Sequence, residues 1–322
     1  MNTMKWLLKR EYWEHKGGFL WAPIVVAAFI GLLSIGSMLF GTVAGNNKGM
    51  FHANGSDFTS LQHALSSVSE ADKTAFATGL ASGYPAIAVP VMITLGFVVF
   101  FYCLGNLFDE RKDRSILFWK SLPVSDRDTV ASKAMTALLV APVIALTVSL
   151  ALALLVVLTL MVLAAINGFN LFGAVFGHTG FYLTFVQTLA FLPVYALWAL
   201  PTVGYLMFVS SWAKSKPFLW AVGVPVIGGV ILSWVNMLAD SPFDLEKYWL
   251  LVARGLGSVF PGSWISAFSD NPDVHVDAGN AMNMLLSASY ELLASANLWL
   301  GAAIGIAFLF GAIKMRRYRD EG

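Results

Sequence analysis

The stretch FLWAPIVVAAFIGLLSIGSMLFG, residues 19–41, contains no charged side chain and is apolar almost throughout. About 20 consecutive apolar residues suffice for a helix to cross the hydrocarbon core of a bilayer, which is about 30 Å thick. At a rise of 1.5 Å per residue, a helix over 19–42 would be about 36 Å long. This stretch therefore predicts a helix that crosses the membrane with some tilt.

Similar apolar stretches recur along the whole chain of 322 residues. They lie at 84–108, 134–163, 181–211, 217–238 and 297–313. The chain is 57% hydrophobic and 12% charged, whereas soluble domains carry about 25% charged residues. No stretch shows the alternation of an outer-membrane barrel strand. We therefore predict an all-α, polytopic integral membrane protein in which residues 1–322 form one domain with six transmembrane helices. The segment LLSASYELLASA, just before the last stretch, is expected to extend that last helix.

The basic residues indicate the orientation of these helices. Sixteen of the 20 Lys and Arg residues fall in four segments, namely 1–18, 109–133, 212–217 and 314–322. With six spans all four segments lie on the same side, and basic residues are retained on the cytoplasmic side during insertion. The first apolar run is too long for the core of a signal peptide and no clear cleavage site follows it. We expect both termini to be cytoplasmic and the protein to reside in the bacterial cytoplasmic (inner) membrane.

The opposite side then carries the segments 43–83, 164–180 and 239–296. The last of these is rich in Trp, Tyr and Phe, which is typical of helices at the membrane interface. We expect short interfacial helices there.

The most highly charged stretch is FDERKDRSILFWKSLPVSDRDTVASK, Phe108–Lys133, with eleven charged residues. At about 3 kcal/mol for each charge in the middle of a bilayer, this stretch has to lie in the cytosol. Pro123 stops a helix at about Leu122, and Ser125 followed by Asp128 is typical of the cap that opens a new helix. The pattern predicts a short cytoplasmic helix over 115–122.

This short helix would present four consecutive apolar side chains, Ile116, Leu117, Phe118 and Trp119. One interpretation is that they dock into a partner protein. The other is that the segment is an ordinary charged loop whose apolar side chains lie flat on the inner leaflet. The pattern alone leaves both open.

The same stretch resembles the connection between the second and third spans of permease subunits of type 2 ATP-binding cassette (ABC) transporters. The resemblance is carried by the order of residues from Phe108 to Arg111, by Asp113-Arg114, by the run from Ser115 to Ser125 and by Lys133. It is close over this stretch, and the layout of six spans matches the family loosely elsewhere. The pair Arg114-Ser115 departs from it, because many relatives have a glycine-containing pair there.

The resemblance implies that the short helix is a coupling helix that docks into an ATPase subunit. The residues it implies for docking are Glu110, Arg111, Asp113, Ile116, Leu117, Phe118, Trp119, Leu122 and Pro123. This chain contains no Gly-x-x-x-x-Gly-Lys-Ser/Thr loop for nucleotide phosphates. We therefore expect a transport subunit that is not itself an enzyme and holds no cofactor, with ATP and Mg bound by separate ABC ATPase subunits. A second permease, either a copy of this chain or a homologue, completes the implied complex.

The amino-terminal segment predicts a helix on the inner membrane surface. Trp6 and Trp13 are seven residues apart and share a helical face, and Lys9 and Arg10 lie between them. In the family the corresponding helix also contacts the ATPase. The alternative is a basic flank that only sets the topology.

The interior of the spans favours one class of transport. No strongly charged residue lies inside them, whereas ion-coupled carriers usually place acidic or basic relays in the membrane. This argues against a carrier driven by protons or sodium and favours a substrate that is bulky, amphipathic or lipid-like. That this substrate is exported is what the resemblance to ABC permeases implies.

Two other function classes remain open from the residues alone, a membrane scaffold or sensor subunit and a membrane enzyme with its site on the outer face. We expect no nucleic acid partner. Four histidines fall in the predicted outer segments, at His52, His63, His178 and His275. Their spacing is not that of a metal site. The motif from Gly301 to Gly305 has the spacing of closely packed helices, either within one subunit or between two.

Overall fold

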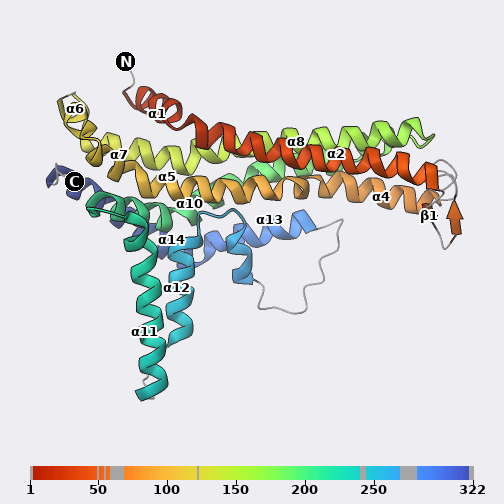
Figure 1. The fold of residues 1–322 in the computed structure, drawn as a ribbon. Coiled ribbons are helices and arrows are strands. Elements are labelled where there is room, and N and C mark those ends of the chain that lie inside the picture. The colour runs from red at the N-terminus through yellow and green to blue at the C-terminus, as the bar shows by residue number, and fades with distance from the viewer. Residues whose placement is uncertain are drawn as a thin grey trace.

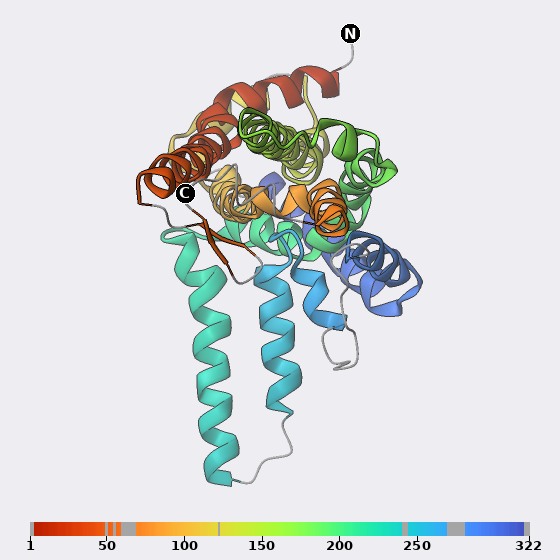
Figure 2. The ribbon, with the colours of Figure 1, turned by 90° about the vertical axis from the view of Figure 1, so that its right-hand side faces the viewer.

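The computed structural model describes residues 3–48, 51–53, 56–58, 69–121, 123–239, 244–268 and 281–318. The fold is almost entirely helical. Long helices run side by side in an elongated bundle, and a helical hairpin projects from the side of this bundle (Figure 1). Figure 2, turned by 90°, looks along the bundle and shows the hairpin projecting away from it.

Six helical segments are long and apolar enough to cross a membrane. They are Gly17–Val43, Glu70–Lys112, Asp126–Ile166, Thr179–Trp212, Leu219–Leu238 and Ala296–Tyr318. The prediction of an all-α protein with six membrane-spanning helices is confirmed, and each predicted span falls within one of these segments or overlaps most of it.

The first half of the chain forms three long helical rods. The first consists of α1 (Thr3–Glu14), η1 (Gly17–Trp21) and α2 (Ala22–Lys48), the second of α4 (Glu70–Gly83), η2 (Tyr84–Ala88) and α5 (Val89–Lys112), and the third of α7 (Asp126–Met135), η3 (Thr136–Val140) and α8 (Ala141–Ile166). A small antiparallel hairpin of β1 (Phe51–Ala53) and β2 (Ser56–Phe58) follows α2. The short helix α6 (Ser115–Ser121) lies between the second and third rods.

The second half adds two further bundle helices and the segments around them. These elements are α9 (Phe172–Phe176), α10 (Thr179–Trp212), η5 (Ser263–Phe268), α13 (Ala281–Glu291), η6 (Leu292–Ala294) and α14 (Ala296–Tyr318). The projecting hairpin, which we call the arm, consists of η4 (Leu219–Gly223), α11 (Val224–Ala239) and α12 (Leu245–Gly257).

Local sequence explains where several helices begin. The Ser125 hydroxyl accepts a hydrogen bond from the Asp128 backbone N at 3.1 Å and donates one to the Asp128 carboxylate at 2.8 Å. Such a cap satisfies backbone donors that the first turn of a helix leaves free. The predicted helix start at Ser125 is confirmed, and α6 ends at Ser121, just before Pro123.

The expected extension of the last helix is wrong. Residues that precede the last span form α13 and η6, and Ser295 then adopts an extended backbone with ψ at 133°. The chain therefore turns before α14 begins at Ala296. The residues on both sides of this turn are predominantly apolar, so hydropathy does not reveal it.

The core lies where α5, α10 and α14 meet. Buried side chains of α5 and α10, among them Val99, Cys103, Val203 and Leu206, pack together there. The backbones of α10 and α14 approach closely, because Gly204 and Gly305 face each other. The motif from Gly301 to Gly305 thus packs helices within one chain. Further from this centre, α4, α8 and α9 share a second apolar cluster.

The arm is attached to the bundle through Arg254 of α12. Its Nη2 donates to the Asn297 carbonyl oxygen at 2.6 Å, and its guanidinium lies 4.6 Å from the ring centre of Trp198. Burial lowers the pKa of Arg254, although an arginine remains protonated. Within the arm, the Tyr248 hydroxyl donates to the Pro225 carbonyl oxygen at 2.6 Å.

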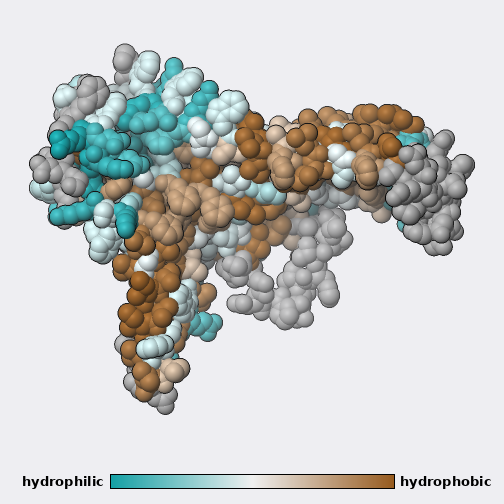
Figure 3. Space-filling view, in the orientation of Figure 1, coloured by the Kyte–Doolittle hydropathy of each residue, from teal (hydrophilic) through white to brown (hydrophobic). Residues whose placement is uncertain are grey.

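Polar and apolar surfaces are separated along the bundle. Hydrophilic residues gather at one end, over α1, α6 and α7 and the carboxyl-terminal end of α14, while the visible flank of the bundle and the arm are largely hydrophobic (Figure 3). We call the hydrophilic end the polar end. It brings together three of the four basic segments recognised in the sequence.

Candidate functional site: a buried charge cluster at the polar end

Four charged side chains from four helices are buried together at the polar end. They are Glu11 of α1, Glu110 of α5, Lys133 of α7 and Arg316 of α14, with exposed fractions of 0%, 5%, 1% and 3%. We call this set the charge cluster. Its two negative and two positive charges balance, which is what allows charged groups to be buried.

The cluster is closely connected. Lys133 Nζ lies 3.0 Å from Glu11 Oε1 and 3.1 Å from Glu110 Oε1. Arg316 forms an ion pair with the other carboxylate oxygen of Glu110. The Tyr102 hydroxyl donates to Glu11 Oε2 at 2.9 Å. Glu110 therefore binds cations from α7 and α14 at the same time.

Two further groups extend the cluster towards the surface. Arg316 Nε lies 3.1 Å from the Asp126 carboxylate, at the start of α7. Arg10 Nη2 lies 3.3 Å from Glu110 Oε1 and 3.2 Å from Glu14 Oε2. The guanidinium of Arg10 also stacks on the ring of Trp119 at 3.4 Å, which ties α6 to α1 through a cation–π contact.

Arg111 joins the second span to the fourth. Its Nη2 donates to the carbonyl oxygens of Ser210 and Ala213, at 2.7 and 2.9 Å. These carbonyls lie at the end of α10, where backbone acceptors lack partners within the helix and a positive charge is favourable. In return, the Ser210 hydroxyl accepts from the backbone N of Leu107 and Phe108.

The turn into α6 contains a strained residue. Arg114 has a φ of 56°, in the left-handed region that costs a residue with a Cβ about 1–2 kcal/mol. Glycine adopts this conformation freely. This is the position at which the sequence departs from the glycine-containing pair of the family it resembles.

The residues predicted for docking fall into three groups. Glu110, Arg111 and Ile116 are buried inside the chain, with Ile116 only 1% exposed. Asp113 and Pro123 are exposed, and Trp119 is half-buried. The side chains of Leu117, Phe118 and Leu122 lie outside the described part of the structure. The docking role stays a prediction for the accessible residues. Of the buried ones, Glu110 accepts a hydrogen bond from the Ser115 hydroxyl of α6 with its carbonyl oxygen, whereas Arg111 binds the end of α10.

The predicted amino-terminal helix is observed as α1, and its place on the inner membrane surface stays a prediction. Trp6 and Trp13 are 56% and 57% exposed, each with a lysine ammonium near its ring, from Lys9 and Lys16 respectively. Leu7 and Glu11 face the bundle instead. Of the predicted interface residues, Arg10 alone turns inward to Glu110.

The charge cluster could hardly be predicted from the sequence. In the sequence Lys133, Glu11 and Arg316 belong to charged flanks of the spans. Lys133 and Glu11 are 122 residues apart and Arg316 and Glu110 are 206 residues apart, and only Lys133 and Glu110 share one charged stretch. One weak signal points to the burial of Glu11. It lies four residues after the apolar Leu7 and therefore on the same side of α1.

The part of the chain that the structure describes contains no cluster with the composition of a metal site. There, no group of three or more His, Cys, Asp or Glu side chains is placed to hold a metal ion. His178 caps α10, with its Nδ1 accepting from the Gly180 backbone N at 3.0 Å. The side chains of His52, His63 and His275 lie outside the described residues.

No protein-family model, curated protein or solved structure matches this chain. Its function therefore has to be inferred from its own residues and their geometry.

Proposed function

We propose that this chain is the permease subunit of an ABC transporter that exports a bulky or amphipathic substrate. The observation that carries the proposal is α6, a short helix between the second and third spans that lies at the polar end, next to the charge cluster. If a soluble partner bound and displaced a helix in this position, the displacement would be transmitted directly to the second and third spans.

The charge cluster extends this connection to other spans. Trp119 of α6 contacts Arg10, and Arg10 pairs with Glu110 at the end of α5. Glu110 in turn binds Lys133, at the start of the third span, and Arg316, at the end of the sixth. Buried ion pairs hold their partners in defined positions because separating them leaves a charge without compensation. A displacement of α6 would therefore move the ends of the first, second, third and sixth spans together.

The energy source in this proposal lies on other chains. Two ABC ATPase subunits bind ATP and Mg and dock on the segment 109–124, and a second permease completes the path. The polar end is cytoplasmic, both termini included, and the membrane is the bacterial inner membrane. The basic residues at the polar end support this orientation.

The test is co-purification with an ATPase whose gene lies next to that of this chain. Phe118→Asp should abolish binding of the ATPase, because a charged carboxylate in an apolar docking surface is left without a partner. Phe118→Leu, which keeps the position apolar, should bind it at nearly the level of the unaltered chain. Both variants have to insert into the membrane equally well.

Equal ATPase binding by Phe118→Asp and Phe118→Leu would contradict docking at α6. The apolar side chains would then face the inner leaflet. ATP hydrolysis that responds to a transported substrate would distinguish a permease from a scaffold or sensor subunit and from a membrane enzyme with an outer-face site, the alternatives that the sequence leaves open.

A further inference from the structure

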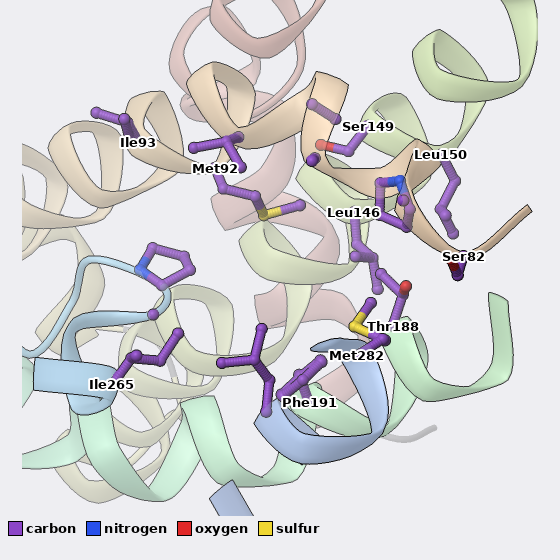
Figure 4. A pocket seen from close by; sticks show the side chains of 18 of the residues that line it. Ser82, Met92, Ile93, Leu146, Ser149, Leu150, Thr188, Phe191, Ile265 and Met282 are labelled. Carbon is purple, nitrogen blue, oxygen red and sulfur yellow. The ribbon is translucent and has the colours of Figure 1, made fainter. Parts of the chain in front are cut away.

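A cavity of about 350 Å³ lies inside the bundle, away from the charge cluster. Its wall comes from α4, η2, α5, α8, α10, η5 and α13, and Figure 4 shows side chains from these elements around it. Ligand sites in proteins have volumes of about 300–1,000 Å³. The cavity is thus large enough for part of a small molecule, and we call it the lateral cavity.

The lateral cavity is lined almost entirely by apolar side chains. The larger ones are Met92, Ile93, Leu146, Leu150, Phe191, Trp264, Ile265, Met282 and Leu285. Among the described residues that line it, none is charged. A ligand with a charged group in this space would lose its hydration without compensation. The wall therefore selects a hydrocarbon group.

One polar atom in the wall stands out. The Ser149 hydroxyl of α8 is buried, with the residue 4% exposed, and has no hydrogen-bond partner within the described structure. The other hydroxyls of the wall differ: Thr188 donates to the Thr184 carbonyl oxygen at 2.7 Å, and Ser82 donates to the Thr78 carbonyl oxygen at 2.9 Å. A buried hydroxyl without a partner is unfavourable. Ser149 is therefore suited to donate to a ligand.

The hydroxyl groups of the wall lie on one side of the cavity, with apolar side chains between them (Figure 4). In Figure 4 Ser82, Ser149 and Thr188 lie towards one side of the cavity, and Ile93 and Ile265 lie at the opposite side. An amphipathic molecule with a polar group at one end of its chain matches this arrangement.

The rim of the cavity is apolar as well. Val89, Ile93 and Ile265 line the cavity and are 51%, 48% and 39% exposed. Val89 and Ile93 belong to a membrane-spanning segment, so this rim opens towards the lipid side of the second span. A hydrocarbon chain can enter from the bilayer without crossing water.

We propose that the lateral cavity binds the hydrocarbon chain of an amphipathic molecule, and that the Ser149 hydroxyl donates a hydrogen bond to an uncharged oxygen of that molecule. If each non-hydrogen atom takes about the 30 Å³ of a water molecule, the cavity holds roughly a dozen atoms. The chain belongs either to a membrane phospholipid or to a separate single-chain amphipath. The site is independent of any ATPase, so its test can fail while the proposed function holds, and the reverse.

The test uses two photoreactive probes on the full-length protein in lipid nanodiscs. One is dodecanol with a diazirine on its chain, and the other is a phosphatidylethanolamine with a diazirine on one acyl chain. After irradiation, labelled peptides are mapped by mass spectrometry. The proposal predicts that labels concentrate on the peptides around 82–93, 146–150 and 261–265, and that excess unlabelled dodecanol or phospholipid, respectively, removes them.

Variants on α8 supply the matched comparison. Ser149→Leu fills the cavity and removes the hydroxyl, and should reduce labelling of these peptides at least about tenfold, as expected when a cavity is closed. Ser149→Ala should reduce labelling about fivefold, because one hydrogen bond is lost. Ala151→Leu, on the exposed side of the same helix, should leave labelling unchanged.

Labelling by the phospholipid probe alone would identify the ligand as bilayer lipid, and labelling by dodecanol would identify a single-chain amphipath; either supports the proposal. Labels spread evenly over the lipid-facing helices, or cavity labels that neither competitor removes, would overturn it. The competition experiment on the unaltered chain decides the matter even if Ser149→Leu folds poorly.

Discussion

Glu110 is the residue on which the polar end depends most. Its carboxylate is 5% exposed and binds Lys133 of α7, Arg316 of α14 and Arg10 of α1. A buried ion pair adds little net stability over an apolar replacement, but removing one partner leaves the remaining buried charges out of balance. Without Glu110, the buried cations Lys133 and Arg316 would keep only Glu11 and Asp126 as counter-charges. The value of Glu110 therefore lies in fixing four helix ends relative to one another.

Glu110→Gln tests this role. The variant leaves Lys133 and Arg316 buried without their shared counter-charge, which should cost about 3–5 kcal/mol. We expect the midpoint of thermal unfolding, followed by tryptophan fluorescence in detergent, to fall by roughly 10 °C.

The matched control is Glu70→Gln. Glu70 also pairs with a lysine, Lys73, but its side chain is 88% exposed, and such surface pairs contribute less than about 1 kcal/mol. If the two variants shift the unfolding midpoint equally, Glu110 does not anchor a buried cluster.

At the residue scale, short-range features could be predicted and long-range ones could not. The cap at Ser125 and the helix end before Pro123 follow from local rules of backbone hydrogen bonding, and both are confirmed. The inward position of Ile116 and the pairing of Glu110 with Arg316 depend on how distant helices pack. Charged residues next to a membrane span look alike whether they face water or each other.

At the scale of the elements, α10 and α14 form the most extensive helix–helix contact among the described helices. A Cβ added to Gly305 would lie 2.5 Å from the Leu200 carbonyl oxygen, far inside normal contact distance. Backbone on the opposite helix cannot move aside as a flexible side chain can. Small residues allow this approach, as they do in many membrane helix pairs.

Gly305→Ala should therefore push α10 and α14 apart. Overpacking of a well-packed interface costs about 1–3 kcal/mol, so we expect a clear loss of thermal stability in detergent. Gly41→Ala is the control, because a Cβ there meets nothing within 4 Å and alanine is favoured over glycine in a helix by about 1 kcal/mol.

A loss of stability for Gly41→Ala as large as that for Gly305→Ala would contradict the contact between α10 and α14. The comparison is informative because Gly41 is followed by Gly45 four residues later, the same spacing as in the motif from Gly301 to Gly305. Spacing alone does not tell them apart.

The existence of the six long helices could be predicted, because an apolar run of sufficient length has few alternatives. Their breaks and directions could not. Ser295 interrupts a run that reads as continuous, and α11 projects in the arm rather than running along the bundle (Figures 1 and 2). Hydropathy reports that α11 prefers apolar surroundings and carries no information on its direction.

For the whole molecule, the decisive property is the separation of a polar end from an apolar bundle (Figure 3). The charge cluster, α1 and α6 all lie at the polar end, so the side of the membrane that this end faces determines which partners can reach α6. ABC ATPases are cytoplasmic, and the proposed function requires the polar end to face the cytoplasm, as the excess of basic residues predicts. Docking of an ATPase on α6 thus requires that the polar end faces the cytoplasm, so one experiment can test the orientation and the docking together.

Ser121→Cys tests this claim most directly. Ser121 is an exposed residue at the end of α6, and the native Cys103 is 0% exposed, so a membrane-impermeant maleimide should react at position 121 alone. The same reagent is applied to right-side-out vesicles, to inside-out vesicles stripped of peripheral proteins, and to stripped vesicles to which the ATPase has been restored. Ala71→Cys, exposed at the opposite end of the second rod, is the control.

We predict that Ser121→Cys is labelled only in inside-out vesicles and is protected when the ATPase is restored, while Ala71→Cys is labelled only in right-side-out vesicles. Labelling of Ser121→Cys from the outside, or unchanged labelling after the ATPase is restored, would contradict a cytoplasmic docking helix and with it the proposed permease.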